Sequence, residues 1–262
     1  MPSYIGTAGW ALPRAVHNAF PADGSHLERY AARFAGVEIN SSFYRAHRRA
    51  VYQRWAACVP QAFRFAVKVP RAITHDQALV AVDVLLEVFM DEVRGLGDRL
   101  GPLLVQLPPS LAFAPDRDDA FLSGLRGVHG GAVACEPRHP SWFTAEANRL
   151  LAKHGVARVA ADPACVPEAS RPGGSPTLVY YRLHGSPRMY YSSYDGGQLE
   201  SLGRTLRLQL SSGADTWCMF DNTASGAATG DALALEASCV AGSHTGGEKA
   251  KRRERQSHPS IS

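Results

Sequence analysis

Short apolar runs of the kind that forms buried strands recur along this chain and alternate with longer amphipathic stretches. The runs lie at Tyr4–Trp10, Val37–Ser42, Phe63–Pro70, Gly101–Pro108, Gly131–Arg138, Ala157–Pro163, Thr177–Gly185 and Thr216–Asn222. Apolar residues at helical spacing predict helices at His26–Phe34, Gln77–Arg94, Asp116–Leu125, Ala145–His154, Gln198–Leu210 and Asp231–Ala237. Strands that alternate with helices are typical of a parallel sheet, and eight such strands predict an α/β fold, a single TIM-type (β/α)8 barrel.

Two segments depart from this alternation. The connection Cys165–Pro176 contains three Pro and two Gly, so we expect the sixth helix of the barrel to be degenerate. After about residue 240 the chain becomes polar and charged and loses its apolar periodicity. Such a segment cannot offset its ordering entropy. We therefore predict a barrel domain over residues 1–240 and a basic, disordered tail over residues 241–262, with a partner-binding or nucleic-acid-binding arm as the alternative for the tail.

Composition narrows the class of protein. The 262 residues, 45% of them hydrophobic, can bury one large core. Of the net charge of +4, the tail contributes +3, from five Lys or Arg against two Glu, so the body is nearly neutral and its charge does not indicate nucleic-acid binding. The five scattered cysteines include no C-x-x-C pair and predict neither disulfides nor a zinc site. With no leader and no apolar stretch of membrane length, we expect a cytoplasmic protein with no membrane partner.

In the predicted strands the polar side chains near the carboxyl ends point to one face of the sheet. In the second strand Glu38 and Asn40 lie on one face, and Val37 and Ile39 on the other. Other strands place polar groups late on the same inner face: Lys68, Gln106, Glu136, Arg138, Asp162, Arg182 and His184. Barrel active sites are built at the carboxyl ends of several strands. A charged ligand pocket is therefore predicted at that end, with a buried ion-pair network that merely closes the barrel as the alternative.

These residue types suit acid/base chemistry on an anion, so the predicted ligand is a phosphorylated or carboxylated small molecule. Lys68, Arg138 and Arg182 would hold its anionic group, Glu136 or Glu38 would act as a base, and His184 would give or take a proton. The predicted catalytic residues are Glu136, Glu38, His184 and Lys68. The predicted ligand-binding residues are Asn40, Tyr44, Gln106, Arg138, Arg182 and Asn222.

Other chemistries remain alternatives. A metal-dependent hydrolase or nuclease would draw its ligands from Glu38, Glu136, Asp162, His184 and Asp221. A single strand-borne histidine and three nearby cations argue against it, so no metal ligand is assigned. A Schiff-base role for Lys68 would be favoured by arginine neighbours that depress its pKa, although a lysine near two glutamates is more often ion-paired.

Binding of nucleic acid without catalysis is a further alternative. It would use aromatic residues near the strand ends, namely Trp10, Phe43, Tyr44, Trp142, Tyr190, Tyr191 and Tyr194. Cofactor and hydrolase motifs such as G-x-G-x-x-G, G-x-x-x-x-G-K-[ST], H-E-x-x-H and G-x-S-x-G are missing from the sequence. The cofactor is therefore unassigned, and the sequence does not decide between an enzyme and a binding protein.

Several long segments, in order through the body of the chain, resemble one known family. They are IGTAGW (Ile5–Trp10), VEINSSFYR (Val37–Arg45), FAVKVPRAITH (Phe65–His75), LLVQLPPS (Leu103–Ser110), EPRHPSW (Glu136–Trp142), YYRLHG (Tyr180–Gly185) and FDNTASGAA (Phe220–Ala228). They are similar to the YecE-like family, also called domain of unknown function 72. The resemblance implies a TIM-type barrel and marks the same strand ends, but it implies no reaction. ALPRAVHNAF, after Trp10, departs from the family's commoner form, and the tail lies outside the resemblance.

Overall fold

The computed structural model describes residues 3–211 and 213–239, whose strands form two sheets. One sheet has the order β1 (Ser3–Thr7), β10 (Asp215–Phe220), β9 (Leu178–Leu183) and β7 (Ala160–Asp162). The other has the order β2 (Gly36–Ile39), β3 (Arg64–Lys68), β4 (Leu100–Gln106), β5 (Val133–Glu136), β6 (Val156–Arg158) and β8 (Gly173–Gly174). Neighbouring strands run parallel except β6 and β8. All eight predicted strands are present, the sixth divided into β6 and β7.

The two sheets adjoin at both edges. Between β1 and β2, Ala8 forms a parallel bridge with Glu38, and Gly9 N donates to Glu38 O at 2.8 Å. At the other side only Val159 separates β6 from β7, and its N–H donates to Cys135 O on β5 at 2.8 Å. The parallel α/β class is confirmed, while the described strands form two adjoining sheets rather than one closed sheet.

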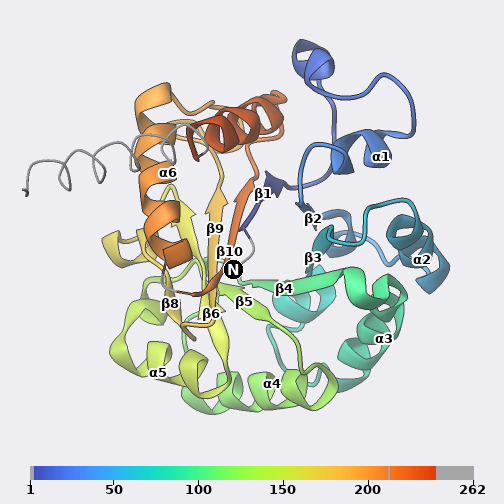
Figure 1. The fold of residues 1–262 in the computed structure, drawn as a ribbon. Helices are drawn as coiled ribbons and strands as arrows, with labels where there is room; N and C mark the ends of the chain where they lie inside the picture. Colours follow the sequence, from blue (N-terminus) through green and yellow to red (C-terminus); the bar gives the residue numbers. More distant parts are fainter. Residues whose placement is uncertain (1–2, 212, 240–262) are drawn as a thin grey trace, which may run out of the picture.

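Helices surround the strands (Figure 1). They are α1 (His26–Ala31), α2 (Arg49–Ala57), α3 (Asp83–Val93), α4 (Pro115–Val128), α5 (Ala145–Lys153), α6 (Gly196–Ser211) and a last helix at 227–239. Shorter 3-10 turns are η1 (Arg14–Ala19), η2 (Ser41–Phe43), η4 (Arg94–Arg99), η5 (Pro140–Phe143) and η6 (Pro167–Ser170), and η3 (Ala72–Asp76) is a π turn. Buried residues such as Phe89, Leu122 and Leu151 anchor the helices to the core that also contains the outer strand faces.

Two segments show how tertiary packing modified the predicted elements. Helix α2 was not predicted, because Tyr52 is its one fully buried side chain and its apolar pattern is weak. The predicted helix at Gln77–Arg94 begins only at Asp83: Ala78, Leu79 and Ala81 have φ of 46°, 71° and 53°, outside the helical region. Leu79 is buried within this turn. Its apolar side chain therefore packs into the core from a turn and is not part of a helical pattern.

The sixth unit is degenerate, as predicted. Between β7 and β9 the chain forms η6 and the two-residue strand β8, with no α-helix. A cavity of about 820 Å³ lies there on the outer side of β9, lined by residues such as Pro172, Tyr181 and Leu202. The predicted tail at 241–262 lies outside the described residues.

Gly6 on β1 packs directly against β2, which makes it a sensitive position. An added Cβ would collide with the Gly36 carbonyl and lie 2.9 Å from Tyr30 Oη. That hydroxyl is buried and accepts a hydrogen bond from Thr7 N at 2.9 Å, so it cannot easily move. We expect Gly6→Ala to lower the free energy of unfolding in urea by about 1–3 kcal/mol. The control is Gly127→Ala in α4, where no atom lies within 4 Å of the added Cβ and a gain of up to about 1 kcal/mol is expected. Equal losses in both variants would contradict the prediction.

Candidate functional site

A layer of apolar side chains underlies the predicted site. Its members are Ala66, Leu104, Ala134, Ala157, Val159, Leu178, Tyr180, Trp217 and Met219. Along each strand a side chain returns to the same face after two residues. The residues two positions after Ala66, Leu104, Ala134, Tyr180 and Met219 are Lys68, Gln106, Glu136, Arg182 and Asp221. The polar groups thus gather at the carboxyl ends of β3, β4, β5, β9 and β10.

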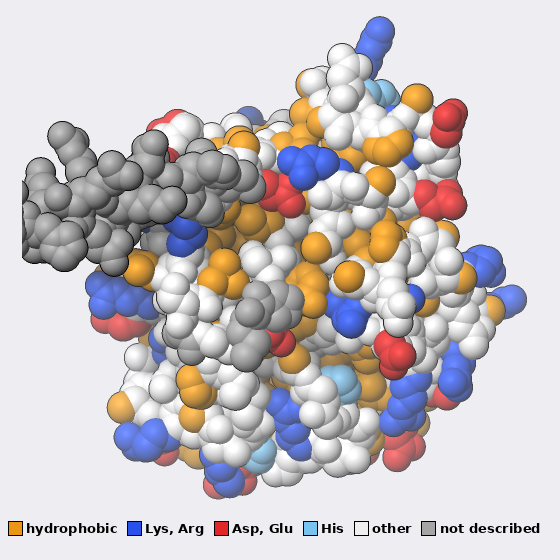
Figure 2. Space-filling view, in the orientation of Figure 1, with side chains coloured by type: hydrophobic (Ala, Val, Ile, Leu, Met, Phe, Trp, Pro, Cys, Tyr) orange, Lys and Arg blue, Asp and Glu red, His pale blue; other side chains and the backbone are white. Residues whose placement is uncertain are grey.

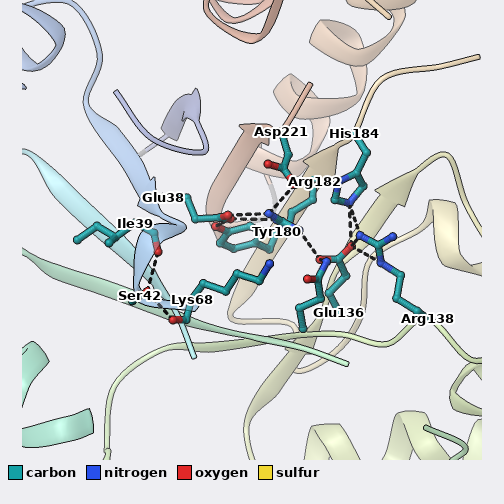
Figure 3. A network of polar contacts seen from close by, with 11 residues as sticks. Glu38, Ile39, Ser42, Lys68, Glu136, Arg138, Tyr180, Arg182, His184 and Asp221 are labelled. Carbon is teal, nitrogen blue, oxygen red and sulfur yellow. Dashed lines mark hydrogen bonds and ion pairs between the residues drawn. The ribbon is translucent and has the colours of Figure 1, made fainter. Parts of the chain in front are cut away.

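Arg182 is the centre of a buried charge network, which we define as Glu38, Glu136, Arg138, Arg182, His184 and Asp221 (Figure 3). Its Nε donates to Glu38 Oε2 at 3.0 Å, and its Nη2 donates to Glu38 Oε1 at 2.7 Å and to Asp221 Oδ2 at 3.0 Å. Its Nη1 donates to Glu136 Oε2 at 2.7 Å. Burial alone would lower the pKa of Arg182, but the three carboxylates outweigh it and raise that pKa well above its usual value. Every nitrogen of this guanidinium is therefore already engaged.

Glu136 is the second centre of the network. Its Oε1 accepts from Arg138 Nε at 3.0 Å and lies 2.8 Å from His184 Nε2. Its Oε2 accepts from Arg182 and from Gln106 Nε2 at 3.1 Å. Burial raises the pKa of Glu136, but the charges of Arg182, His184 and Arg138 outweigh this and hold the pKa well below its ordinary value. Glu136 is thus a stable carboxylate and a weak base.

Both ring nitrogens of His184 have charged neighbours. Its Nδ1 lies 3.1 Å from Asp221 Oδ2, and its Nε2 lies 2.8 Å from Glu136 Oε1 and 3.0 Å from Arg138 Nη2. With both ring nitrogens protonated it donates to both carboxylates. With Nε2 unprotonated, that nitrogen accepts from Arg138. Both ring nitrogens therefore lie within hydrogen-bond distance of charged side chains.

Tyr180 fixes the other end of the network. Its hydroxyl donates to Glu38 Oε2 at 2.9 Å, and its ring is stacked on Trp217 with centroids 6.0 Å apart. Burial, followed by the neighbouring charge of Glu38, raises the pKa of Tyr180 well above its ordinary value. This phenol therefore remains a hydrogen-bond donor and orients Glu38 toward Arg182.

Lys68 points toward the network without joining it (Figure 3). The residue is 4% exposed, and its Nζ lies 4.0 Å from the centroid of the Phe43 ring. Among the described residues, no carboxylate oxygen lies within 4.0 Å of this amine. Burial first, and then the charge of Arg182, lower the pKa of Lys68 to about 8 although the nearby carboxylates oppose this. The ion pairing expected for a lysine beside two glutamates does not form; the glutamate oxygens bond instead to Arg182, Arg138 and His184.

The turn after β2 positions the aromatic ring beneath Lys68. Ser42 Oγ donates to the Lys68 carbonyl at 2.6 Å and to the Ile39 carbonyl at 3.0 Å. These bonds fix the end of β3 against η2, the turn that carries Phe43. Phe43 is itself held between Tyr44 and His75, each with a ring centroid 4.9 Å away. The face presented to Lys68 is thus a rigid, apolar one.

The structure brings together seven of the ten predicted site residues and separates three. The seven are Glu38, Lys68, Gln106, Glu136, Arg138, Arg182 and His184. Tyr44 is 73% exposed, and Asn222 donates instead to Asp231 and to the Ser192 carbonyl. Asn40 lies after β2 with its buried Oδ1 unpartnered among the described residues.

Sequence reasoning did not assign roles at the site to two residues that the network contains or contacts. Asp221 had been weighed only as a metal ligand, and Tyr180 had not been assigned a role. Asp221 lies two residues after Met219, and Tyr180 two residues before Arg182, so both belong to the inner face of their strands. That shared face was the signal that could have identified them.

The network is almost entirely buried at the strand ends. Its Glu38, Glu136, Arg182, His184 and Asp221 are each at most 5% exposed, whereas the Arg138 side chain is 16% exposed. Two cavities of about 820 and 810 Å³ lie elsewhere, outside β9 and at the amino ends of the strands. In residues 3–211 and 213–239 no three His, Cys, Asp or Glu side chains are arranged to hold a metal ion. The predicted pocket at these strand ends stays a prediction.

Relatives of known structure share this fold. A DUF72 family protein from Enterococcus faecalis V583 is 18% identical, with a TM-score of 0.76, over 91% of this chain and 95% of that one. A DUF72 family protein from Thermotoga maritima MSB8 is 25% identical, with a TM-score of 0.73, over 89% of this chain and 97% of that one. Both confirm that the arrangement of strands and helices is that of a known structural group.

Two similar sequences are both named as UPF0759 proteins. UPF0759 protein YecE of Escherichia coli K12 is 34% identical over 177 residues, which is 64% of this chain and 62% of that protein. UPF0759 protein YunF of Bacillus subtilis is 26% identical over 212 residues, or 74% of each protein. The matched region thus spans somewhat less than two thirds of the length of YecE.

None of the described helices is both long and apolar enough to cross a membrane.

The family model described as protein of unknown function DUF72 matches residues 4–255, a range that extends into the segment predicted as a tail. This match confirms the resemblance seen in the strand-end segments. The chain belongs to the DUF72 family.

Proposed function

We propose that this protein binds a phosphorylated or carboxylated small molecule at the carboxyl ends of β3, β5 and β9 and transforms it by acid/base chemistry. The observation that carries the proposal is the buried amine of Lys68, a cation with no paired carboxylate among the described residues. A buried charge without a partner is costly. An anionic group of a ligand would supply that partner.

The charges at the site favour binding of an anion coupled to uptake of a proton. Three carboxylates (Glu38, Glu136 and Asp221) oppose three cations (Lys68, Arg138 and Arg182), so their sum is zero when His184 is neutral. A negative charge added beside Lys68, whose pKa is about 8, would favour the protonated form of this amine. Binding of the anion should therefore be coupled to proton uptake.

Within this proposal the ligand contacts fall to residues with unused donors. Arg138 uses Nε and Nη2 for Glu136 and His184, and its Nη1 has no partner among the described residues. Lys68 and this Nη1 would hold the anionic group, because each nitrogen of Arg182 already bonds to a carboxylate. His184 would move the proton, while Glu136 and Glu38, which were predicted as bases, would hold the cations in place.

Depth of burial favours a small molecule over a nucleic acid. A phosphate backbone is bound by accessible Lys and Arg side chains, whereas Lys68 and Arg182 are 4% and 0% exposed. On the face drawn in Figure 2, Lys and Arg side chains are interspersed with Asp and Glu, with no continuous basic patch. A compact ligand that enters between the strand ends fits these observations better.

We also propose that the eight parallel strand positions form a complete (β/α)8 barrel. Support comes from the bridge between Ala8 and Glu38 and from the near-continuous β6 and β7, which join the two sheets at both edges. In such a barrel the inner face carries the apolar layer and then the network, in the order described above.

A thermal-shift screen with inorganic phosphate, pyruvate and other small carboxylates tests the binding proposal. At a hundredfold excess over the dissociation constant, a ligand should stabilise the native state by about 2.7 kcal/mol. Arg138→Ala should remove this stabilisation. Arg204→Ala should retain it, because Arg204 lies on α6 in an exposed pair with Glu200. Calorimetry in buffers of different ionisation enthalpy should show proton uptake. Stabilisation by divalent metals alone, or by single-stranded DNA alone, would contradict the proposal.

A further inference from the structure

We propose that Lys68 is an amine nucleophile that forms a Schiff base with the carbonyl group of an anionic substrate, such as an oxo acid or a phosphorylated aldehyde. This inference rests on the anion site proposed above and names the class of substrate that the site would take. It assigns to Lys68 a covalent role rather than a purely electrostatic one.

The first support is the position of the amine. Lys68 Nζ projects from the end of β3 toward the network, yet the carboxylates it faces are already bonded to Arg182 (Figure 3). Its Nζ lies over the Phe43 ring, 4.0 Å from the ring centroid. No ion pair has to be broken when the amine loses its proton. An amine held in this way can become neutral and present its lone pair to a carbonyl carbon.

The second support is the choice of residue. The chain has 28 Lys and Arg, of which only four are lysines, Lys68, Lys153, Lys249 and Lys251. Arginine, which provides both cations of the network, keeps its charge under all ordinary conditions and forms buried ion pairs well. A lysine forms such pairs less well, but it can be deprotonated and can attack a carbonyl. A site that needed only a third positive charge would be served by another arginine.

The third support is the electrostatic surroundings of the amine. Burial and the neighbouring guanidinium of Arg182 lower the pKa of Lys68 to about 8, against about 10.4 for an exposed lysine. About a tenth of the amine is therefore neutral at pH 7, while exposed lysines are almost entirely charged. This difference makes Lys68 selectively reactive among the lysines of the chain.

The reaction balances without an oxidant or a reductant. The neutral amine adds to the carbonyl carbon, a C–N bond forms, and the carbonyl oxygen receives the proton that the nitrogen releases. The resulting hydroxyl then leaves as water with a proton from His184, and the C=N bond forms. His184 lies next to Glu136 and Asp221 and can carry that proton, and Arg138 would hold the carboxylate or phosphate of the substrate.

Reductive trapping tests the inference on the full chain. The protein is incubated with pyruvate and sodium cyanoborohydride, which reduces an imine to a stable secondary amine. We expect a single adduct with the mass of pyruvate less one oxygen atom, located on Lys68 by peptide mapping. Lys68→Arg, which keeps the charge but cannot form an imine, should lose the adduct. Lys153→Arg is the matched control and should retain it, because Lys153 is exposed and paired with Asp119 at 2.7 Å.

The pH dependence and a binding assay separate this inference from the function on which it rests. Trapping should become faster as pH rises from 6 and level off above about 8, whereas labelling of the other lysines should keep rising toward pH 10. Adducts spread over Lys153, Lys249 and Lys251 with none on Lys68 would overturn the Schiff base. If phosphate and pyruvate still raised the melting temperature of wild type, the anion site would stand without it. If no anion raised the melting temperature, the proposed function itself would fail.

Discussion

Replacement of Arg182 by methionine is expected to lower the free energy of unfolding by about 3–5 kcal/mol, the usual cost of removing one partner from a buried ion pair. Arg182 is 0% exposed and bonds to Glu38, Glu136 and Asp221. Its loss leaves these carboxylates with Arg138 and Lys68 as the nearby cations. Since domains of this kind are stable by about 5–15 kcal/mol, the variant should lose a large part of its stability in urea unfolding.

Two comparisons establish that the effect comes from the uncompensated charges. Arg204→Ala removes the exposed pair with Glu200 and should change the unfolding free energy by no more than about 0.5 kcal/mol. Adding Glu38→Gln to the Arg182→Met variant removes one of the unpaired carboxylates and should restore part of the stability. If the double variant were no more stable than Arg182→Met alone, the loss would have to come from packing instead.

The protein is expected to lose stability in acid because of Glu136 and Asp221. Burial raises the pKa of both carboxyl groups, but Arg182 and His184 outweigh it, so the folded-state pKa of each is lower than its ordinary value. The folded state therefore binds protons less readily than the unfolded chain. The stability that results is fully present above about pH 4.3, the ordinary range of these groups, and is lost as pH falls through the folded-state values. Urea unfolding should show a loss of at least about 2 kcal/mol between pH 5 and pH 2, the scale of one paired carboxylate.

A variant of Glu136 provides the control for this pH dependence. Glu136→Gln keeps the shape of the side chain and cannot ionise, so it should be less stable than wild type at pH 7, with a smaller further loss on acidification. The two proteins should become more similar in stability as the pH approaches 2. If both lost stability in parallel from pH 5 downward, other carboxyl groups would be responsible.

The alternation of side chains along the strands explains why much of the site was predictable. Glu38, Glu136 and His184 were assigned to one inner face from the order of residues alone, and the structure places them in one network. The same pattern located the strands within a few residues. Helical spacing, by contrast, gave a wrong prediction at the turn that contains Leu79. A buried apolar residue in a turn and one in a helix look alike in sequence.

Partner choice within the network could not be predicted. Two arginines and one lysine were expected to share the carboxylates or to hold the ligand together. In the structure Arg182 bonds to Glu38, Glu136 and Asp221, whereas the Lys68 amine lies over the Phe43 ring. The choice depends on side-chain reach and direction across β2, β5, β9 and β10, which are far apart along the chain. No local pattern contains that distance information.

The sequence by itself determined the α/β class, the positions of the eight predicted strand segments and the face on which the charges lie, because alternation and periodicity are properties of neighbouring residues. The tertiary structure alone decided that Arg182 bonds to three carboxylates, that Tyr180 supports Glu38, and that the Lys68 amine is buried with its pKa at about 8. Burial and charge proximity set these properties, and both arise only when strands distant in sequence are packed around one interior.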